Sequence, residues 1–375
     1  MPQVQAIYGA INGILGVLNE ELVDLRQEDP ITISRLRKTP SAALGSCRYK
    51  LSERDYSRVL EVFAAHKISY FLYAGGNDSM DTAHKVAELA AEKSYGLQVI
   101  GVPKTVDNDL LVTDHCPGYG SVARFNSIAA RDAGLDTDAI STTDAIKIVE
   151  TMGRDTGWIT ASTALGKAGS DSAPHLIYLP ERPFVLGQFL ADVKSVYDRL
   201  GRVVICVCEG LRDEKGDFVK ASTKKLDTDR FGHAQLGGVG DCLVNLISEH
   251  LGIKARCDKP GTIQRVSMIC ASETDLNEAY QVGLIAALRA VEGDSDKMVT
   301  LIRRNDDPYE CETGIVELER VALRTKKMPD EFINNDANFV SEGFLRYARP
   351  LIGAPLPEYA HLNRKMVEKL LPTRI

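Results

Sequence analysis

Short apolar runs alternate with helical patterns along most of the chain. The runs are rich in β-branched and aromatic residues and have the length of strands: 68–74, 97–102, 145–149, 175–179, 203–208, 266–271 and 298–302. Between several of them, apolar residues recur every three to four positions, which predicts helices over 81–93 and 277–291. Strands that alternate with helices are typical of parallel sheets, and their unbroken apolar character indicates that both faces are covered. The pattern predicts an α/β fold with doubly wound, mostly parallel sheets.

Three polar segments are expected at the surface. Residues 211–235 and 304–313 are highly charged and rich in turn formers, which indicates solvated excursions from the sheets. The basic run at 324–327 is interpreted as the solvated face of a helix rather than as a binding patch.

Length and charge limit the classes of protein and partner. A chain of 375 residues allows two domains of about 150 residues or more each. The 45 basic and 52 acidic residues leave a net charge of −7, so the chain has no global attraction for nucleic acid or for an anionic membrane. We therefore expect neither as a partner, whereas a local basic pocket can still bind a small anionic substrate.

The expected location is the cytoplasm. No apolar run approaches the about 18–20 residues of a membrane span, and no basic stretch precedes the apolar start as in a signal peptide. The eight cysteines are scattered without a CxxC pair, and Cys206 and Cys208 belong to a run typical of a buried strand. Reduced core cysteines of this kind are typical of a reducing compartment.

Polar motifs follow four of the expected strands. They are GGNDS at 75–79, PKTVDND at 103–109, ETMGR at 150–154, and Glu209-Gly210. In open α/β sheets, ligands bind beyond the carboxyl ends of the strands. Together the four motifs therefore predict one polar cleft.

The first motif has the composition of a phosphate-binding loop. Gly75 and Gly76 allow backbone amides to approach a phosphate, and a helix that begins near Ser79 directs its positive end to the same point. An ordinary glycine-rich turn between strand and helix is the alternative. Asn77 and Asp78 favour the functional interpretation, because oxygen ligands beside a phosphate suit Mg²⁺.

The second motif is the most specific. Asp107 and Asp109 lie two residues apart, and Lys104 precedes the first of them by three. A turn explains Pro103 and Asn108 but not the whole set. A carboxylate can take the proton of an attacking hydroxyl while a lysine neutralises charge on a transferring phosphate, so the motif predicts phosphoryl transfer.

These motifs carry a resemblance to a known family. In order and approximate spacing, GGNDS, PKTVDND, ETMGRDTGW, CEG and PGTIQR resemble the phosphofructokinase family, and most of all its pyrophosphate-dependent members. The likeness runs from about residue 6 to about residue 362. It implies two α/β domains with the active site in the cleft between them, and a homodimer or homotetramer. Residues 1–140 and 266–330 would form the donor-binding domain, and 141–265 and 331–375 the sugar-phosphate-binding domain.

The resemblance also implies roles around the reacting hydroxyl. Asp107 would be the general base that deprotonates the C1 hydroxyl of fructose 6-phosphate, and Thr105 would hold the sugar beside it. Met152, Gly153 and Arg154 would bind the sugar and the transferring phosphate, with Arg154 stabilising the charge of the transition state.

The rest of the sugar phosphate has its own expected ligands. Glu209 would accept hydrogen bonds from the fructose hydroxyls. Thr262 and Arg265 match the stretch of the family that binds the 6-phosphate, and Arg256 matches an arginine that often reaches it from a neighbouring subunit.

The implied donor depends on two residues. Relatives that use ATP have glycine where this chain has Asp78 and where it has Lys104. A carboxylate at the first position would repel the α-phosphate of a nucleotide, and an ammonium at the second would stabilise pyrophosphate. The implied metal is Mg²⁺ on Asn77 and Asp109, although Asn77 replaces a more usual aspartate.

Other departures from the family leave alternatives open. Ala145 replaces a phosphate-binding arginine, and Lys147 is a possible substitute for it. Residues 6–18 are interpreted as the helix that follows the family's first strand and Gly-rich loop, so we expect that strand and loop to be absent. The alternatives are an ATP-dependent 6-phosphofructokinase, a catalytically impaired regulatory subunit and, more remotely, an NAD kinase.

Overall fold

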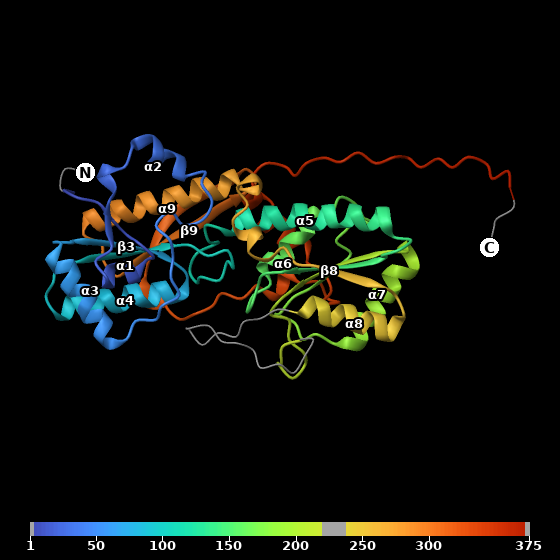
Figure 1. Cartoon of the computed structure of the whole chain (residues 1–375), viewed down its shortest axis with the longest axis horizontal. Helices are drawn as coiled ribbons and strands as arrows, with labels where there is room; N and C mark the ends of the chain where they lie inside the picture. Colours follow the sequence, from blue (N-terminus) through green and yellow to red (C-terminus); the bar gives the residue numbers. More distant parts are fainter. Residues whose placement is uncertain (1–3, 220–237, 372–375) are drawn as a thin grey trace.

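Two lobes lie side by side along the long axis of the molecule (Figure 1). The structure is a computed structural model that describes residues 4–219 and 238–371. The charged segment expected over 211–235 lies outside the described residues from 220 onward. In the described part of the chain, no helix combines the length and apolarity that crossing a membrane requires.

The first lobe is built on a four-stranded sheet. Its strands are β3 (Tyr70–Gly75), β4 (Gln98–Pro103), β9 (Lys297–Asp306) and β10 (Tyr309–Glu317), in the order β10-β9-β4-β3. β3, β4 and β9 run parallel, and β10 returns antiparallel to β9. Among the described strands only β4 pairs with β3, so β3 forms one edge of the sheet.

Helices cover both faces of this sheet. Val99 of β4 packs in one core with α3 (Glu53–Ala65) and α4 (Asn77–Glu92). The next residue, Ile100, points to the other face and packs against α9 (Glu273–Glu292). Successive residues of a strand alternate between faces, so an uninterrupted apolar run is the pattern that a doubly covered sheet requires.

The second lobe repeats the arrangement with four parallel strands. They are β5 (Ile146–Thr151), β6 (Leu176–Tyr178), β7 (Val203–Cys208) and β8 (Ala255–Asp258), in the order β6-β7-β5-β8. One face packs against α5 (Tyr119–Ile140), α6 (Trp158–Ser162) and α10 (Glu342–Ala348). The other packs against α7 (Leu186–Leu200) and α8 (Val239–Leu251). The expected α/β fold with two doubly wound, mostly parallel sheets is confirmed.

Six of the seven expected strands are present, and the expectation of a strand over 266–271 is wrong. That segment follows the 3₁₀ turn η3 (Gly261–Arg265) and contains the 3₁₀ turn η4 (Met268–Cys270), and Ile269 within it is 98% exposed. Its apolar composition therefore does not reflect burial within this chain.

The expectation of one helix over residues 6–18 is also wrong. Residues 6–18 do not form one helix but contain the strand β1 (Tyr8–Ala10) and the short helix α1 (Ile14–Leu18). β1 pairs antiparallel with β2 (Leu22–Asp24), and Gly13, with φ +62°, allows the turn that starts α1. After η1 (Leu25–Gln27), α2 (Pro30–Leu36) lies on the surface with none of its residues buried.

Two of the polar segments also differ from expectation. Residues 304–313 are not a loop excursion, because they complete the hairpin between β9 and β10. Residues 324–327 lie in an irregular connection between η5 (Leu318–Arg320) and η6 (Asp330–Phe332) rather than in a helix, and Lys326 is half-buried. The remaining short turns are η2 (Thr163–Gly166) and η7 (Pro350–Ile352).

Candidate active site

Pairing of β3 with β4 brings the first two motifs together. Gly75 lies opposite Pro103 in the parallel register, and the Lys104 amide donates to the Gly75 carbonyl at 3.1 Å. A Cβ at Gly75 would overlap the side chain of Ser79, so glycine lets α4 begin directly after the strand. Asp78 lies exposed in the first turn of α4, beside the expected phosphate loop.

The loop between β4 and α5 holds Asp107 at the junction of the lobes. Thr105 Oγ1 accepts a hydrogen bond from the Asp107 amide at 3.2 Å, and the Thr105 amide donates to the Pro117 carbonyl at 3.2 Å. From the second lobe, Thr156 Oγ1 donates to the Asp107 carbonyl at 3.1 Å. Hydrogen bonds with threonine side chains of both lobes therefore fix the backbone of Asp107.

The electrostatic surroundings of Asp107 suit a general base. Burial, together with the negative charges of Asp109 and Glu209, raises its pKa from 3.8 to about 7, while Arg154 and Lys104 oppose the rise. Five of the residues expected from the sequence are thus close enough to influence one another. A base is most effective when its pKa lies near the working pH.

The other wall of the cleft comes from the ends of β5 and β7. Thr151 lies opposite Cys208, the Glu209 amide donates to the Thr151 carbonyl at 3.2 Å, and the Gly210 amide donates to the Gly153 carbonyl at 3.0 Å. Gly153 has φ +136°, a conformation that side chains rarely adopt. The two loops therefore pack backbone against backbone.

Charges on this wall are only partly compensated. Burial raises the pKa of Glu209, and the Gly153 amide and Arg154 oppose the rise. Arg154 Nε is buried without a hydrogen-bond partner among the described residues. A buried donor of this kind is available to an anionic ligand.

The η3 turn is anchored by a residue that sequence reasoning did not select. Gln264 is 2% exposed, and its Oε1 accepts from the Met152 amide at 3.3 Å and from Asn126 Nδ2 at 3.1 Å. Thr262 and Arg265 remain exposed on the same turn. Burial and the charge of Arg265 lower the pKa of Lys104, so the η3 turn influences the donor motif electrostatically.

Two basic residues on the second sheet do not join this cleft. Arg256 on β8 forms an ion pair with Asp144 at 2.7 Å. Lys147, considered as a substitute for a missing arginine, pairs with Asp136 at 2.6 Å and with Asp258 at 3.1 Å. Neither has a contact with the other expected site residues in the part of the chain that the structure describes.

The expected metal ligands lie side by side. Asn77 Nδ2 donates to Asp109 Oδ2 at 3.0 Å. The other oxygens of the two side chains, Asn77 Oδ1 and Asp109 Oδ1, are buried and lack hydrogen-bond partners within the described ranges. Burial raises the pKa of Asp109, while a hydrogen bond with Thr105 and the charge of Lys326 oppose the rise. Two orphaned acceptor oxygens fit a hard divalent cation such as Mg²⁺.

Sequence reasoning also missed Arg48. It lies in the loop before α3, and its charge lowers the pKa of Glu209 against the effect of burial. In the sequence it appears only as GSCR at 45–48, a single arginine after small residues, and this pattern alone does not indicate a site residue.

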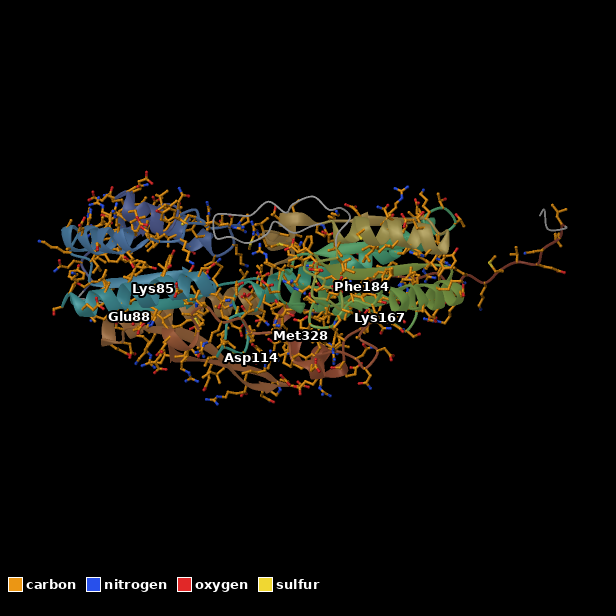
Figure 2. The ribbon with its side chains drawn as sticks, turned by 90° about the horizontal axis from the view of Figure 1, so that it is seen from below. Lys85, Glu88, Asp114, Lys167, Phe184 and Met328 are labelled. Carbon is orange, nitrogen blue, oxygen red and sulfur yellow. The ribbon has the colours of Figure 1, made fainter. Side chains whose placement is uncertain are left out.

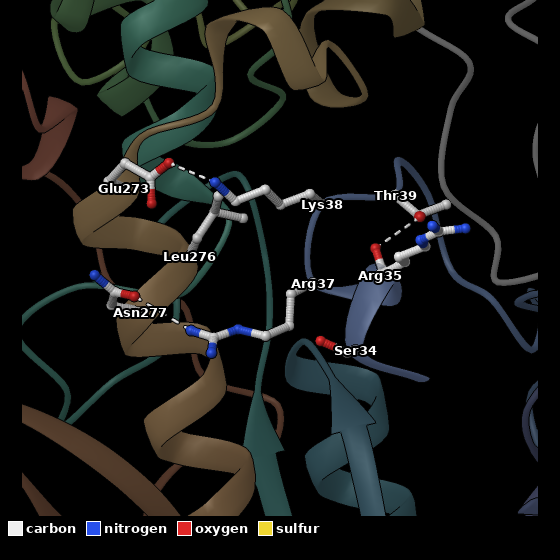
Figure 3. Close-up of a pocket in the computed structure, with 8 residues that line it drawn as sticks. All are labelled: Ser34, Arg35, Arg37, Lys38, Thr39, Glu273, Leu276 and Asn277. Atoms are coloured by element: carbon white, nitrogen blue, oxygen red, sulfur yellow. Dashed lines mark hydrogen bonds and ion pairs between the residues drawn. The ribbon is translucent and has the colours of Figure 1, made fainter. Parts of the chain in front are cut away.

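A hollow of about 570 Å³ lies elsewhere, between the segment after α2 and the start of α9 (Figure 3). Two of its basic side chains, Arg37 and Lys38, already have partners. Lys38 pairs with Glu273 at 3.2 Å, and Arg37 donates to Asn277 at 3.3 Å and lies 4.2 Å from the ring centre of Tyr280. None of the expected catalytic residues lines this hollow, so the polar cleft remains the candidate site.

Comparison with known proteins decides the family. The family model described as "Phosphofructokinase" matches residues 2–287. The chain belongs to the phosphofructokinase family. A pyrophosphate–fructose 6-phosphate 1-phosphotransferase of Xanthomonas campestris pv. campestris is 43% identical to this phosphofructokinase chain over 381 residues, covering 98% of the chain and 91% of the relative.

Solved structures agree with this assignment. The pyrophosphate-dependent phosphofructokinase from Marinobacter aquaeolei superimposes on the chain with a TM-score of 0.85 at 37% identity, covering 100% of this chain and 92% of that one. The corresponding protein from Nitrosospira multiformis gives 0.86 at 38% identity, with coverage of 99% and 91%. The two-lobed architecture is therefore that of known phosphofructokinases.

Proposed function

We propose that the chain transfers a phosphoryl group from pyrophosphate to the C1 hydroxyl of fructose 6-phosphate. The products are fructose 1,6-bisphosphate and phosphate, in a reversible reaction of glycolysis. The observation that carries the proposal is the convergence of Asp107, with a pKa of about 7, on Lys104, Arg154 and Glu209 between the lobes. The names of the Xanthomonas and Marinobacter relatives support the same reaction.

Asp107 acts as the base in this proposal. Its carboxylate takes the proton of the C1 hydroxyl as the hydroxyl oxygen bonds to phosphorus, and the bond from phosphorus to the bridging oxygen of pyrophosphate breaks. Arg154, whose Nε has no described partner, stabilises the charge on the transferring group. Glu209 and Thr105 orient the sugar, and Met152 and Gly153 form its wall.

The 6-phosphate is assigned to the η3 turn. Arg265 and Thr262 lie exposed there, and Gln264 fixes the turn against Met152. Arg256 would serve this phosphate from a second subunit, since in its own chain it is paired with Asp144.

Asp78 and Lys104 set the donor. Asp78 lies at the start of α4, where a nucleotide phosphate would meet its charge, and Lys104 lies beside the Gly75–Gly76 turn. Pyrophosphate has no nucleoside part and needs no room beyond this point. ATP is therefore the disfavoured donor.

Mg²⁺ fits the pair Asn77 and Asp109. The two orphaned oxygens would hold the ion beside the phosphate loop, and its chemistry there is to neutralise the charge of pyrophosphate. The neutral amide of Asn77 leaves Asp109 as the charged ligand of the pair.

The same proposal includes a homodimer or homotetramer in the cytoplasm. Ile263, Val266 and Ile269 are 63%, 37% and 98% exposed on η3 and η4, next to the site, and a second subunit would cover them. All eight cysteines are free, which suits a reducing compartment.

The donor domain is proposed as 1–140 with 266–330 and the sugar domain as 141–265 with 331–375. That division places α5 in the donor domain, whereas Tyr119 and Val122 of α5 pack against Val149 of the second sheet.

Donor kinetics test the proposal. Formation of fructose 1,6-bisphosphate, coupled to aldolase, is measured with pyrophosphate and then with ATP, each with Mg²⁺. We expect turnover with pyrophosphate to be much faster than turnover with ATP. In the variant carrying Asp78→Gly and Lys104→Gly, the rate with pyrophosphate should fall strongly, whereas the KM for the sugar should change much less. Unchanged pyrophosphate kinetics in this variant contradict the donor assignment, and turnover with neither donor from folded protein favours a silent regulatory subunit.

A further inference from the structure

Lys326 is a half-buried residue whose ammonium the proposed reaction does not use. Its ammonium donates to the carbonyls of Thr113 at 3.2 Å and Asp114 at 2.7 Å and to Asn108 Oδ1 at 3.3 Å. Its backbone amide donates to the Asp109 carbonyl at 2.7 Å. No ion pair joins this ammonium to a carboxylate over 4–219 and 238–371. All four acceptors belong to the loop that carries Asp107 and Asp109.

Lys326 connects two segments by which the chain passes from one lobe to the other, and each such segment is called a crossing. The loop from 104 to 118 leads from β4 to α5, and the connection from 321 to 329 leads from the hairpin of the first lobe to η6. Lys326 bonds the second crossing to the first. Asp114 and Met328, one on each crossing, lie near the middle of the long axis (Figure 2).

Neighbouring groups complete the enclosure of the loop. Tyr347 on α10 donates to the Asp114 carbonyl at 3.0 Å and accepts from Asn108 Nδ2 at 3.0 Å. Arg303 donates to Asp114 Oδ1 at 3.1 Å and to the Tyr347 carbonyl at 2.8 Å. Asn108 has φ +54°, so the short turn between the two aspartates is held in a conformation that it would not favour by itself.

Trp158 lies directly against this lysine. Its indole N–H donates to the Lys326 carbonyl at 3.4 Å, and the ammonium lies 5.3 Å from the ring centre. Trp158 is 2% exposed and is the only tryptophan in the sequence, so tryptophan fluorescence reports on the surroundings of this one ring, which include Lys326 and Tyr347.

We propose that Lys326 is a positioning residue that fixes the loop 104–118 across the two lobes and so holds Asp107 and Asp109 in the cleft. The inference deepens the proposed function and depends on it. Lys326 does not reach the substrate; it sets the geometry of the residues that do. An error of about 1 Å in such geometry is enough to cost about a hundredfold in rate.

The test compares Lys326→Met with Lys327→Met, which removes the exposed neighbouring charge. For Lys326→Met we expect kcat to fall at least tenfold, the KM for fructose 6-phosphate to change less than threefold, and Trp158 emission to shift. For Lys327→Met we expect all three to stay at wild-type values. A kcat of Lys326→Met within twofold of wild type overturns the proposal, whatever happens to its stability.

A second variant covers the case in which Lys326→Met does not fold. Tyr347→Phe removes one α10 hydroxyl that bonds to the same loop, without changing charge or shape. We expect it to fold and to lose about threefold or more in kcat with little change in KM. Wild-type kcat in Tyr347→Phe, together with wild-type Trp158 emission, overturns the positioning role. Activity of the wild-type protein is measured in parallel, so failure of the proposed function remains distinct from failure of this inference.

Discussion

The substitution Asp107→Asn should stabilise the protein while it removes activity. Asp107 has a pKa of about 7 in the folded chain against an ordinary value of 3.8, so folding disfavours its ionised form. At 1.36 kcal/mol per pH unit, that difference corresponds to about 4 kcal/mol as an upper bound. Because water enters the cleft and the loop can relax, we expect a gain of about 1–3 kcal/mol at pH 8.

The pH dependence of this gain follows from linkage. Below pH 3.8 the carboxyl is protonated in both the folded and the unfolded chain, so the wild type and Asp107→Asn should be equally stable. Between pH 3.8 and 7 the unfolded chain releases the proton while the folded chain retains it, and the advantage of the variant grows. Above pH 7 the advantage is constant. Wild-type activity should rise with pH through about 7, since the base must be ionised.

Urea unfolding at pH 3.5, 5.5 and 8, with turnover measured on the same samples, checks this prediction. Loss of the base should lower kcat by about 10²–10⁴-fold, which corresponds to about 3–5 kcal/mol of barrier. Asp336→Asn, at an exposed position, is the matched control and should change neither quantity. A variant of Asp107 that is less stable than wild type at pH 8, or that keeps more than a tenth of its kcat, refutes the reasoning.

Three further predictions concern other parts of the cleft. Gly210→Ala places a Cβ onto the Arg154 carbonyl, so it should lower stability by about 1–3 kcal/mol and reduce turnover; an unchanged Tm contradicts the packing. Arg48→Ala should lower kcat/KM for the sugar by about tenfold to a hundredfold, while Arg54→Ala, an exposed control on α3, should not; equal kinetics for both variants exclude a role for Arg48. Asn77→Asp adds a charged ligand, so the Mg²⁺ concentration for half-maximal activity and for thermal stabilisation should fall; a rise in both places the metal elsewhere.

Motifs at the strand ends were predictable because their residue types are out of place there. Carboxylates, lysine and paired glycines directly after apolar strands have few structural uses, and parallel pairing brings such ends to one edge of the sheet. The sequence alone therefore indicates a cleft at these strand ends, and the pairing of Gly75 with Pro103 and of Thr151 with Cys208 brings the ends together.

The failures have physical reasons as well. Apolar composition indicates burial without saying by what, so 266–271 was expected as a strand although it contains the 3₁₀ turn η4 with Ile269 exposed. In the basic run 324–327, nothing in the residue types distinguishes Lys326, which turns inward, from Lys327, which remains exposed. Gln264 acts through a contact with Met152, and the charge of Arg48 acts on Glu209, each more than a hundred positions away, which no local pattern encodes.

Phosphorus NMR of one reaction mixture tests the central claim most directly. The protein is mixed with Mg²⁺, pyrophosphate and fructose 6-phosphate, and the phosphorus signals are followed in time. We predict that pyrophosphate disappears while inorganic phosphate and a new C1 phosphate ester form in equal amounts, and that Asp107→Asn stops both. Pyrophosphate that persists, or that yields inorganic phosphate without the ester, contradicts the account.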